Sequence, residues 1–356
     1  MSSGTYYPPS GVYSDSYKKD MRIIKTKSQA AMGVMFLIFL FLVPMIPGIN
    51  SPYVLRLITG AAITIIICLG LNILTGYCGQ LNIGQSAFVM IGAFTAGLLN
   101  YDLGWPLWAN IIPSGLAASV AGVIFGAPSV RLKGLYLALT TLAAQIVLTW
   151  IALYHISLAS AGFVVDPAAI GSIVFDTPDK FYYVAMVFTC AMCFFAKSIV
   201  RSGIGRAFMA IRDNDIAAEA MGINIFRYKL LAFIICTFYA GVAGALFAHY
   251  MMWVQLESFN LIDSVWYVVM IIVGGLGSIE GTIFGVIFIV ALKEIISVVG
   301  PMVEGSISYL PTGAGSGFLL VTIGVVAILF LILEPRGLAH RWRIIKAYYR
   351  LWPYGY

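Results

Sequence analysis

Long uninterrupted runs of apolar residues constrain this chain more than any other feature of its sequence. A helix needs about 20 apolar residues to cross the hydrocarbon core of a bilayer. Hydrophobic residues make up 61% of the chain and charged residues 10%, and a water-soluble core has no use for so much apolar surface. The sequence therefore predicts an all-α polytopic membrane protein. The runs of spanning length lie near residues 31–49, 53–75, 83–101, 107–127, 134–156, 181–197, 229–252 and 317–334.

A further apolar region, residues 263–300, is too long for one span. It contains the sequence Gly-Gly-Leu-Gly-Ser at residues 274–278, where a helix is expected to break. We interpret the region as two short spans, which gives a bundle of about 8–10 transmembrane helices, with ten as the preferred count. A re-entrant pair within eight spans remains the alternative. A closed β-barrel is a poor alternative, because the apolar runs are continuous and do not alternate.

The distribution of basic residues predicts the orientation. With the N-terminus in the cytoplasm and a change of side at each span, every Lys and Arg falls inside except Arg56, Lys180 and Lys293. Cytoplasmic loops of membrane proteins carry an excess of Lys and Arg, so this pattern favours cytoplasmic N- and C-termini. The net charge of +6 therefore describes membrane topology, and no nucleic-acid partner is expected.

Three regions follow from this reading. Residues 1–30 are polar and predict a disordered cytoplasmic tail. Residues 31–335 form the transmembrane domain, and a cytoplasmic loop at 198–228 lies within it. Residues 336–356 form a basic cytoplasmic tail.

Two glycine-interrupted polar segments, residues 76–86 and 274–281, each separate a pair of apolar runs. Interrupted segments in corresponding halves of a transporter point to its pathway. Neutral hydrogen-bonding side chains can line such a passage without the cost of burying an ion. Two tight cytoplasmic turns would explain the pattern equally well. The candidate path residues are Gly79, Gln80, Asn82, Gln85, Ser86, Gly274, Gly277 and Ser278.

The loop 198–228 is a charged island between two apolar runs. Residues 206–212 can form one short helix. Asp215 is a suitable N-cap for a second, and Gly222 sits where a left-handed residue ends a helix. Helices this short need a partner surface, and the acidic residues favour a protein groove over a membrane surface. The candidate contact residues are Arg206, Phe208, Ile211, Arg212, Asp213, Asp215, Glu219 and Gly222, with Met221 as a further apolar contact.

Ala217-Ala218-x-x-x-Gly222 resembles the core of the cytoplasmic "EAA" loop of bacterial ATP-binding-cassette (ABC) importer permeases, although Ile216 occupies that motif's leading Glu position. The wider sequence resembles the LivM-type permeases of branched-chain amino acid importers, in blocks spread over residues 55–340. The blocks are GLNILTGYCGQLNIGQSAFVMIGAFTAGLL from Gly70, RLKGLYLALTTLA from Arg131, GRAFMAIRDNDIAAEAMGINIFRYK from Gly205, VGGLGSIEGTIFG from Val273 and EPRGL from Glu334.

The resemblance implies one of two permease subunits in a prokaryotic plasma (inner) membrane importer for leucine, isoleucine and valine. Two ATPase subunits inside and a solute-binding protein outside would be its partners. The chain contains no Gly-Lys dipeptide, so it holds no Walker A loop, and ATP-Mg would bind to the partners. Urea and amide importers have closely similar permeases, so the solute class stays open at this point.

Two other classes of protein fit the sequence less well. A stand-alone ion-coupled carrier commonly places a carboxylate or His within the membrane, yet the apolar runs at 57–101 and 107–130 contain no charged residue. An intramembrane enzyme would need a catalytic constellation, and the spans contain no His-Glu-x-x-His motif, paired aspartates or Ser/His arrangement. We therefore expect neither catalytic residues nor a metal site.

Overall fold

The structure is a computed structural model. It describes residues 35, 40–45, 51–132, 134–155, 161–170, 173–306, 337–351 and isolated positions between 321 and 334. Eight helices in this part of the chain are long and apolar enough to cross a membrane. The prediction of an all-α polytopic membrane protein is therefore confirmed. The eight are α3 (Pro52–Asn72, extended by a π-helical turn at Ile73–Tyr77), α4 (Gln85–Leu103), α5 (Leu107–Ser129), α6 (Leu135–His155), α7 (Pro178–Arg201), α10 (Ile225–Met251), α11 (Leu261–Gly274, of membrane length only together with the preceding segment from Leu256) and α12 (Ile279–Ser306).

The predicted break in the region 263–300 is confirmed, because α11 ends at Gly274 and α12 begins at Ile279. Gly275 and Gly277, between the two helices, have φ of 117° and 72°, a backbone conformation that favours glycine. The predicted tail 1–30 lies outside the described residues, as do most of the apolar runs 31–49 and 317–334. The count of ten spans therefore stays a prediction.

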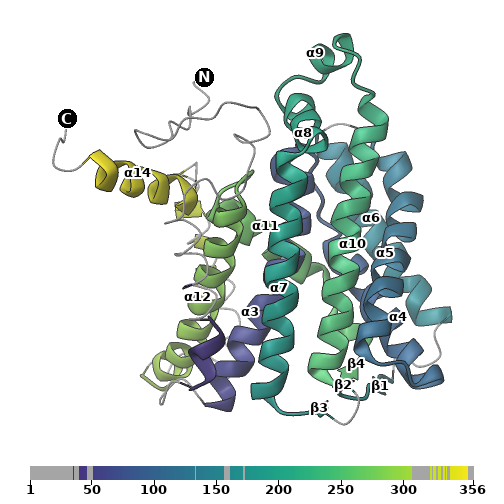
Figure 1. Ribbon diagram of the computed structural model, residues 1–356, viewed down its shortest axis with the longest axis vertical. Helices are drawn as coiled ribbons and strands as arrows, with labels where there is room; N and C mark the ends of the chain where they lie inside the picture. The colour runs from purple at the N-terminus through teal and green to yellow at the C-terminus, as the bar shows by residue number, and fades with distance from the viewer. Residues whose placement is uncertain are drawn as a thin grey trace.

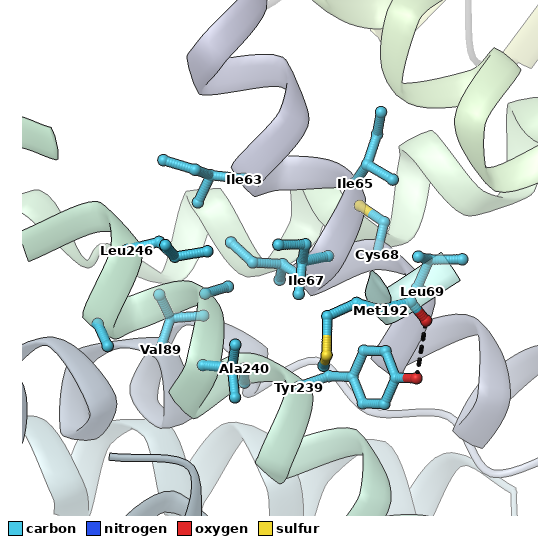
Figure 2. Close-up of a cluster of buried hydrophobic side chains, with 14 of the residues drawn as sticks. Ile63, Ile65, Ile67, Cys68, Leu69, Val89, Met192, Tyr239, Ala240 and Leu246 are labelled. Atoms are coloured by element: carbon cyan, nitrogen blue, oxygen red, sulfur yellow. Dashed lines mark hydrogen bonds between the residues drawn. The ribbon is translucent and has the colours of Figure 1, made fainter. Parts of the chain in front are cut away.

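Helix α10 lies at the centre of the bundle and packs against α3, α4 and α5 (Figure 1). Small residues make this packing close, since a Cβ added at Gly92 of α4 would lie 2.3 Å from the Gly241 carbonyl oxygen of α10. In lipid, where apolar side chains gain little by leaving the solvent, such backbone approach is a main source of helix association. Figure 2 shows the adjoining apolar core, where the Tyr239 hydroxyl of α10 donates to the Met192 carbonyl of α7 at 3.0 Å.

Short strands close the end of the bundle at which α3 and α7 begin (Figure 1). Strand β1 (Phe163–Val164) pairs antiparallel with β4 (Trp253–Val254), and β2 (Ala168–Ile170) pairs antiparallel with β3 (Ile173–Phe175). At the opposite end lie α8 (Gly203–Asp213) and α9 (Asp215–Ala220). A further helix, α14 (Leu338–Leu351), runs crosswise to the bundle where a basic tail was predicted. The two ends of the bundle are thus built differently.

Candidate functional site

The charged loop folds as two short helices, α8 and α9, which meet at Asn214. Helix α8 follows α7 after a single residue, and α9 forms the tip of the molecule (Figure 1). The N-cap of α9 is Asn214, whose side chain accepts from the Ala217 amide at 3.1 Å, and Asp215 is the first helical residue. The prediction of Asp215 as N-cap was therefore wrong by one position. The neighbouring amide side chain reaches the same orphan amide groups of the first turn.

The far end of α9 has the geometry that the sequence predicts. Gly222 adopts φ of 85°, and its amide donates to the Glu219 carbonyl at 2.9 Å. The Ile223 amide donates to the Ala218 carbonyl at 3.0 Å, which completes a Schellman-type ending. The turn sends the chain back toward the bundle, where Asn224 caps α10 by accepting from the Arg227 amide at 3.0 Å.

Helix α8 is held against the bundle by its apolar side. Phe208 is fully buried and its ring packs edge-on against Tyr228 of α10, with centroids 6.4 Å apart. Ile211, one turn later, is also buried. The expected role of Phe208 and Ile211 as apolar contacts for a partner needs correction, because the chain's own helices already cover them. Helical periodicity gave their shared face correctly but could not say what covers it.

Helix α9 has the opposite character. Ile216 is 75% exposed and Met221 82% exposed, and both lie in a segment beyond the membrane-spanning helices. Contiguous exposed apolar surface marks contact sites, so these two side chains make this segment a candidate contact surface. Asp213 and Glu219 are exposed beside them, as are Arg206 on α8 and Gly222. A groove of about 640 Å³ runs between α9 and the start of α10, lined among others by Asp215, Glu219 and Arg131. Ile216 was not among the predicted contacts.

Arg212 connects α8 to the first polar segment. Its Nη1 donates to the Gly76 carbonyl oxygen at 2.7 Å, and its Nη2 lies 3.4 Å from Asp213 Oδ1. Gly79 and Gly277 lie against the same side chain, since a Cβ at either position would come within 2.9 Å of an Arg212 atom. Both glycines also have positive φ. The loop and both glycine-interrupted segments therefore meet at one arginine.

Asn72, near the end of α3, joins the two polar segments directly. Its Nδ2 donates to the Ser278 carbonyl at 3.0 Å and to Thr282 Oγ1 at 2.7 Å, and its Oδ1 accepts from the Gly277 amide at 2.9 Å. Gly76 is tightly enclosed, because a Cβ there would lie 2.4 Å from the Gly277 nitrogen. The sequence analysis did not single out Asn72, although a lone polar side chain inside an apolar run indicates a buried hydrogen-bonding partner. Gly274, also a predicted path residue, packs against Gly281 and Gly285 of α12.

The remaining path candidates lie in a buried polar cluster where α4 begins. Asn82 Nδ2 donates to Gln85 Oε1 at 2.9 Å, and the Ser86 amide donates to Ser264 Oγ of α11 at 2.8 Å. Gln145 of α6 accepts from the Ala87 amide at 2.8 Å. These side chains are all buried. The cluster ties α4, α6 and α11 together by neutral hydrogen bonds.

Gln80 lies between this cluster and the charged loop. Its side chain is 2% exposed and has no hydrogen-bond partner within the described residues. It lines a cavity of about 360 Å³ together with Gly79, Arg212 and Asp213. Burial raises the pKa of the neighbouring Cys78 thiol to about 12, so this thiol stays protonated at neutral pH. The cavity thus joins the predicted path to the predicted contact surface, and it carries no reactive nucleophile at Cys78.

Known proteins resemble this chain over most of its length. Residues 53–333 match the family described as "Branched-chain amino acid transport system / permease component". The high-affinity branched-chain amino acid transport system permease protein LivM of Escherichia coli K12 is 31% identical over 259 residues, 65% of this chain and 61% of that protein. The chain thus matches less than two thirds of that relative's length.

Two more distant relatives are named for different solutes. The probable branched-chain amino acid transport permease protein LivM of Methanocaldococcus jannaschii is 23% identical over 77% of this chain and 89% of its own length. The guanosine ABC transporter permease protein NupQ of Bacillus subtilis is 22% identical over 48% of this chain and 59% of its own length.

Proposed function

We propose that this chain is the membrane-spanning permease subunit of an ABC importer for leucine, isoleucine and valine. The premise is that the chain belongs to the branched-chain amino acid transport permease family. The eight helices of membrane length are what a translocation subunit requires. The E. coli and M. jannaschii relatives are both named as branched-chain amino acid transport permeases. The chain is then a transport subunit that catalyses no reaction itself.

The proposed assembly contains a second permease, two ATPase subunits and a solute-binding protein on the outer face. The ATPases would bind ATP-Mg, since the chain has no Walker A loop. Helix α9 and the groove beside it are the proposed docking surface, supported by the exposed Ile216 and Met221 next to exposed acidic side chains. This assignment places α8, α9 and both termini in the cytoplasm, as the distribution of basic residues also indicates.

The proposed mechanism transmits force from α9 to the bundle. ATP-driven closure of the ATPases pushes on residues 205–222, and the motion tilts α7 and α10, which adjoin α8 and α9 in the chain. The pathway then opens outward, and ATP hydrolysis resets it. Short connections favour this transmission, because one residue separates α7 from α8 and one separates α8 from α9.

The observation that carries the proposal is the hydrogen bond from Arg212 to the Gly76 carbonyl oxygen. This hydrogen bond joins the charged loop to the chain just after α3. Asn72, the last residue of α3, in turn contacts the break between α11 and α12 by accepting from the Gly277 amide. A buried charged donor on a carbonyl stabilises by about 1.5–3 kcal/mol, and the value here is lower because the Arg212 side chain is 41% exposed. A displacement of α8 is therefore passed to the polar segments directly.

Uptake into vesicles that contain the complete reconstituted complex tests the function. We expect ATP-dependent accumulation of leucine, isoleucine and valine, with urea and guanosine excluded. Uptake of urea or guanosine in place of the amino acids would contradict the solute assignment while leaving the transport class intact. Uphill uptake by the chain without ATPase partners would contradict the ABC assignment itself.

A further inference from the structure

Helix α14 runs sideways from the bundle at the level where α12 begins, whereas α9 lies beyond that level at the tip of the molecule (Figure 1). Contacts with the first turn of α12 fix this position. Ala339 is buried there, since a Cβ added at Gly281 would lie 3.0 Å from its Cβ, and Lys346 Nζ lies 3.6 Å from Glu280 Oε2. Because α12 is long enough to cross a membrane, α14 lies at the height where such a span leaves the hydrocarbon.

One face of α14 is turned toward the membrane. The Trp342 ring packs edge-on against Phe284 of α12, with centroids 5.8 Å apart. Phe284 lies about 7.5 Å along the axis from the start of α12 at Ile279, so the Trp342 face points along the span and not away from it. Ile345 follows Trp342 by three residues and shares its face. The two side chains remain 40% and 57% exposed, so the protein's own helices leave apolar surface uncovered on the membrane side.

The remainder of α14 is basic. Its sequence, LAHRWRIIKAYYRL, contains four Lys or Arg residues and no Asp or Glu. Arg341 and Arg343 are exposed on either side of Trp342 in the sequence, and Lys346 lies over the Trp342 ring at 5.4 Å from its centroid. Helices that lie in a membrane interface combine Trp and aliphatic residues on one face with Lys and Arg on the other. Helix α9 lacks this composition, because its charged residues are acidic.

Two carboxylates offset part of the positive charge but leave donors for a further acceptor. Arg341 Nε lies 2.5 Å from Glu334 Oε2, and Lys346 pairs with Glu280. The side chains of Arg341 and Lys346 are nevertheless 65% and 47% exposed, and a guanidinium has five N–H donors and an ammonium three. Arg343 makes no ion pair within the described residues, and its Nε donates to the Ala339 carbonyl at 3.4 Å. The surface therefore suits a phosphate.

We propose that α14 is an interfacial helix that binds the headgroups of anionic phospholipids. Trp342 and Ile345 lie at the boundary between headgroups and acyl chains, and Arg341, Arg343 and Lys346 donate to lipid phosphate oxygens. Basic residues next to a span attract anionic lipids in this way. An acidic soluble protein would satisfy the same charges, but it would not reach an apolar face that points along α12. The inference involves neither the solute nor the ATPases, and so it goes beyond the proposed function.

Quenching of Trp342 fluorescence by brominated phospholipids tests the site in the full-length chain in detergent micelles. The probes are phosphatidylglycerol and phosphatidylcholine brominated on their acyl chains, and the Trp342 signal is the difference between each protein and its own Trp342→Phe counterpart. Half-quenching should need at least about tenfold less phosphatidylglycerol than phosphatidylcholine, because each basic residue near an anionic surface raises affinity about fivefold. Equal quenching by the two lipids would overturn the proposal, as would the absence of Trp342 quenching.

Two double variants break the same ion pairs but change the charge in opposite directions. Arg341→Gln/Lys346→Gln should lower the preference for phosphatidylglycerol to below about threefold, whereas Glu334→Gln/Glu280→Gln should raise it above that of the unaltered chain. If both variants lower the preference equally, the ion pairs only hold the helix in place and the proposal is wrong.

The matched control is Lys180→Gln/Arg227→Gln, which removes two exposed cations outside α14 and should keep the full preference. A loss of preference in this control would show that net charge, and not α14, attracts the lipid. If Arg341→Gln/Lys346→Gln keeps its lipid preference but no longer co-purifies with partner subunits, α14 is a protein interface and the proposal fails.

Discussion

Helices α8 and α9 are adjacent in sequence, yet they relate to the rest of the molecule in opposite ways. Helix α8 buries Phe208 and Ile211 and donates a hydrogen bond from Arg212 into the bundle, whereas α9 leaves Ile216 and Met221 exposed. An element that transmits force must be attached at one end to the helix bundle that moves and must be accessible at the other end to the partner protein that binds it. In the proposed function, this contrast makes α8 the attached part and α9 the part that the ATPases contact.

The comparison predicts the largest loss of stability at the fixed helix. Phe208→Ala should lower the free energy of unfolding by about 3–5 kcal/mol, because it removes a fully buried ring and leaves a cavity against Tyr228. Thermal unfolding of the purified chain measures this change. The matched variant Ile216→Ala, on the exposed helix, should stay within about 0.5 kcal/mol. Similar losses at both positions would show that α8 and α9 do not differ in attachment.

A smaller loss is expected at the turn that ends α9. Gly222→Ala should cost about 1–2 kcal/mol, because the residue has φ of 85° and no neighbouring atom restricts the added methyl group. The effect is thus one of backbone strain alone. Gly203→Ala, at the first position of α8, would meet only Arg206 Nη2 at an ordinary 3.8 Å and has no positive φ, so it should be neutral or slightly stabilising. Unfolding midpoints of the two variants decide between them.

The smallest change in stability should accompany the largest loss of binding. Replacing both Asp213 and Asp215 by Lys should leave membrane insertion and the unfolding midpoint nearly unchanged but release the ATPase subunits during co-purification. The control Asp102→Lys/Asp179→Lys makes the same change in net charge at exposed positions at the other end of the bundle. If the Asp213 and Asp215 variant still co-purifies with the ATPases and transports normally, α9 is not the docking surface.

Elements defined by local chemistry were predictable from the sequence. The spans follow from hydropathy, the break before α12 from its glycines, and the end of α9 from Gly222, because each depends on residues close together in the chain. The direction of Phe208 was not predictable, since an apolar helix face looks the same whether its own bundle or a partner covers it. Only the tertiary structure separates these cases.

Contacts between distant segments were out of reach for a different reason. Arg212 and Gly76 are 136 residues apart, and Asn72 and Thr282 are 210 apart. The local sequence around each of these residues does not indicate which distant segment it contacts. Arg56 illustrates the same limit, because the sequence presents it as a cation at the end of a span. Only the packing of α3 against α12 brings it into one cavity with Glu294.

Comparing ATP hydrolysis with leucine uptake in Arg212→Ala complexes tests the central claim most directly. The claim is that force received at α9 reaches the polar segments through this side chain. We predict that Arg212→Ala retains ATPase binding and ATP hydrolysis but loses at least about tenfold in leucine taken up per ATP, while Arg227→Ala, an exposed arginine of the same loop, keeps the normal ratio. An unchanged ratio in Arg212→Ala would contradict the account.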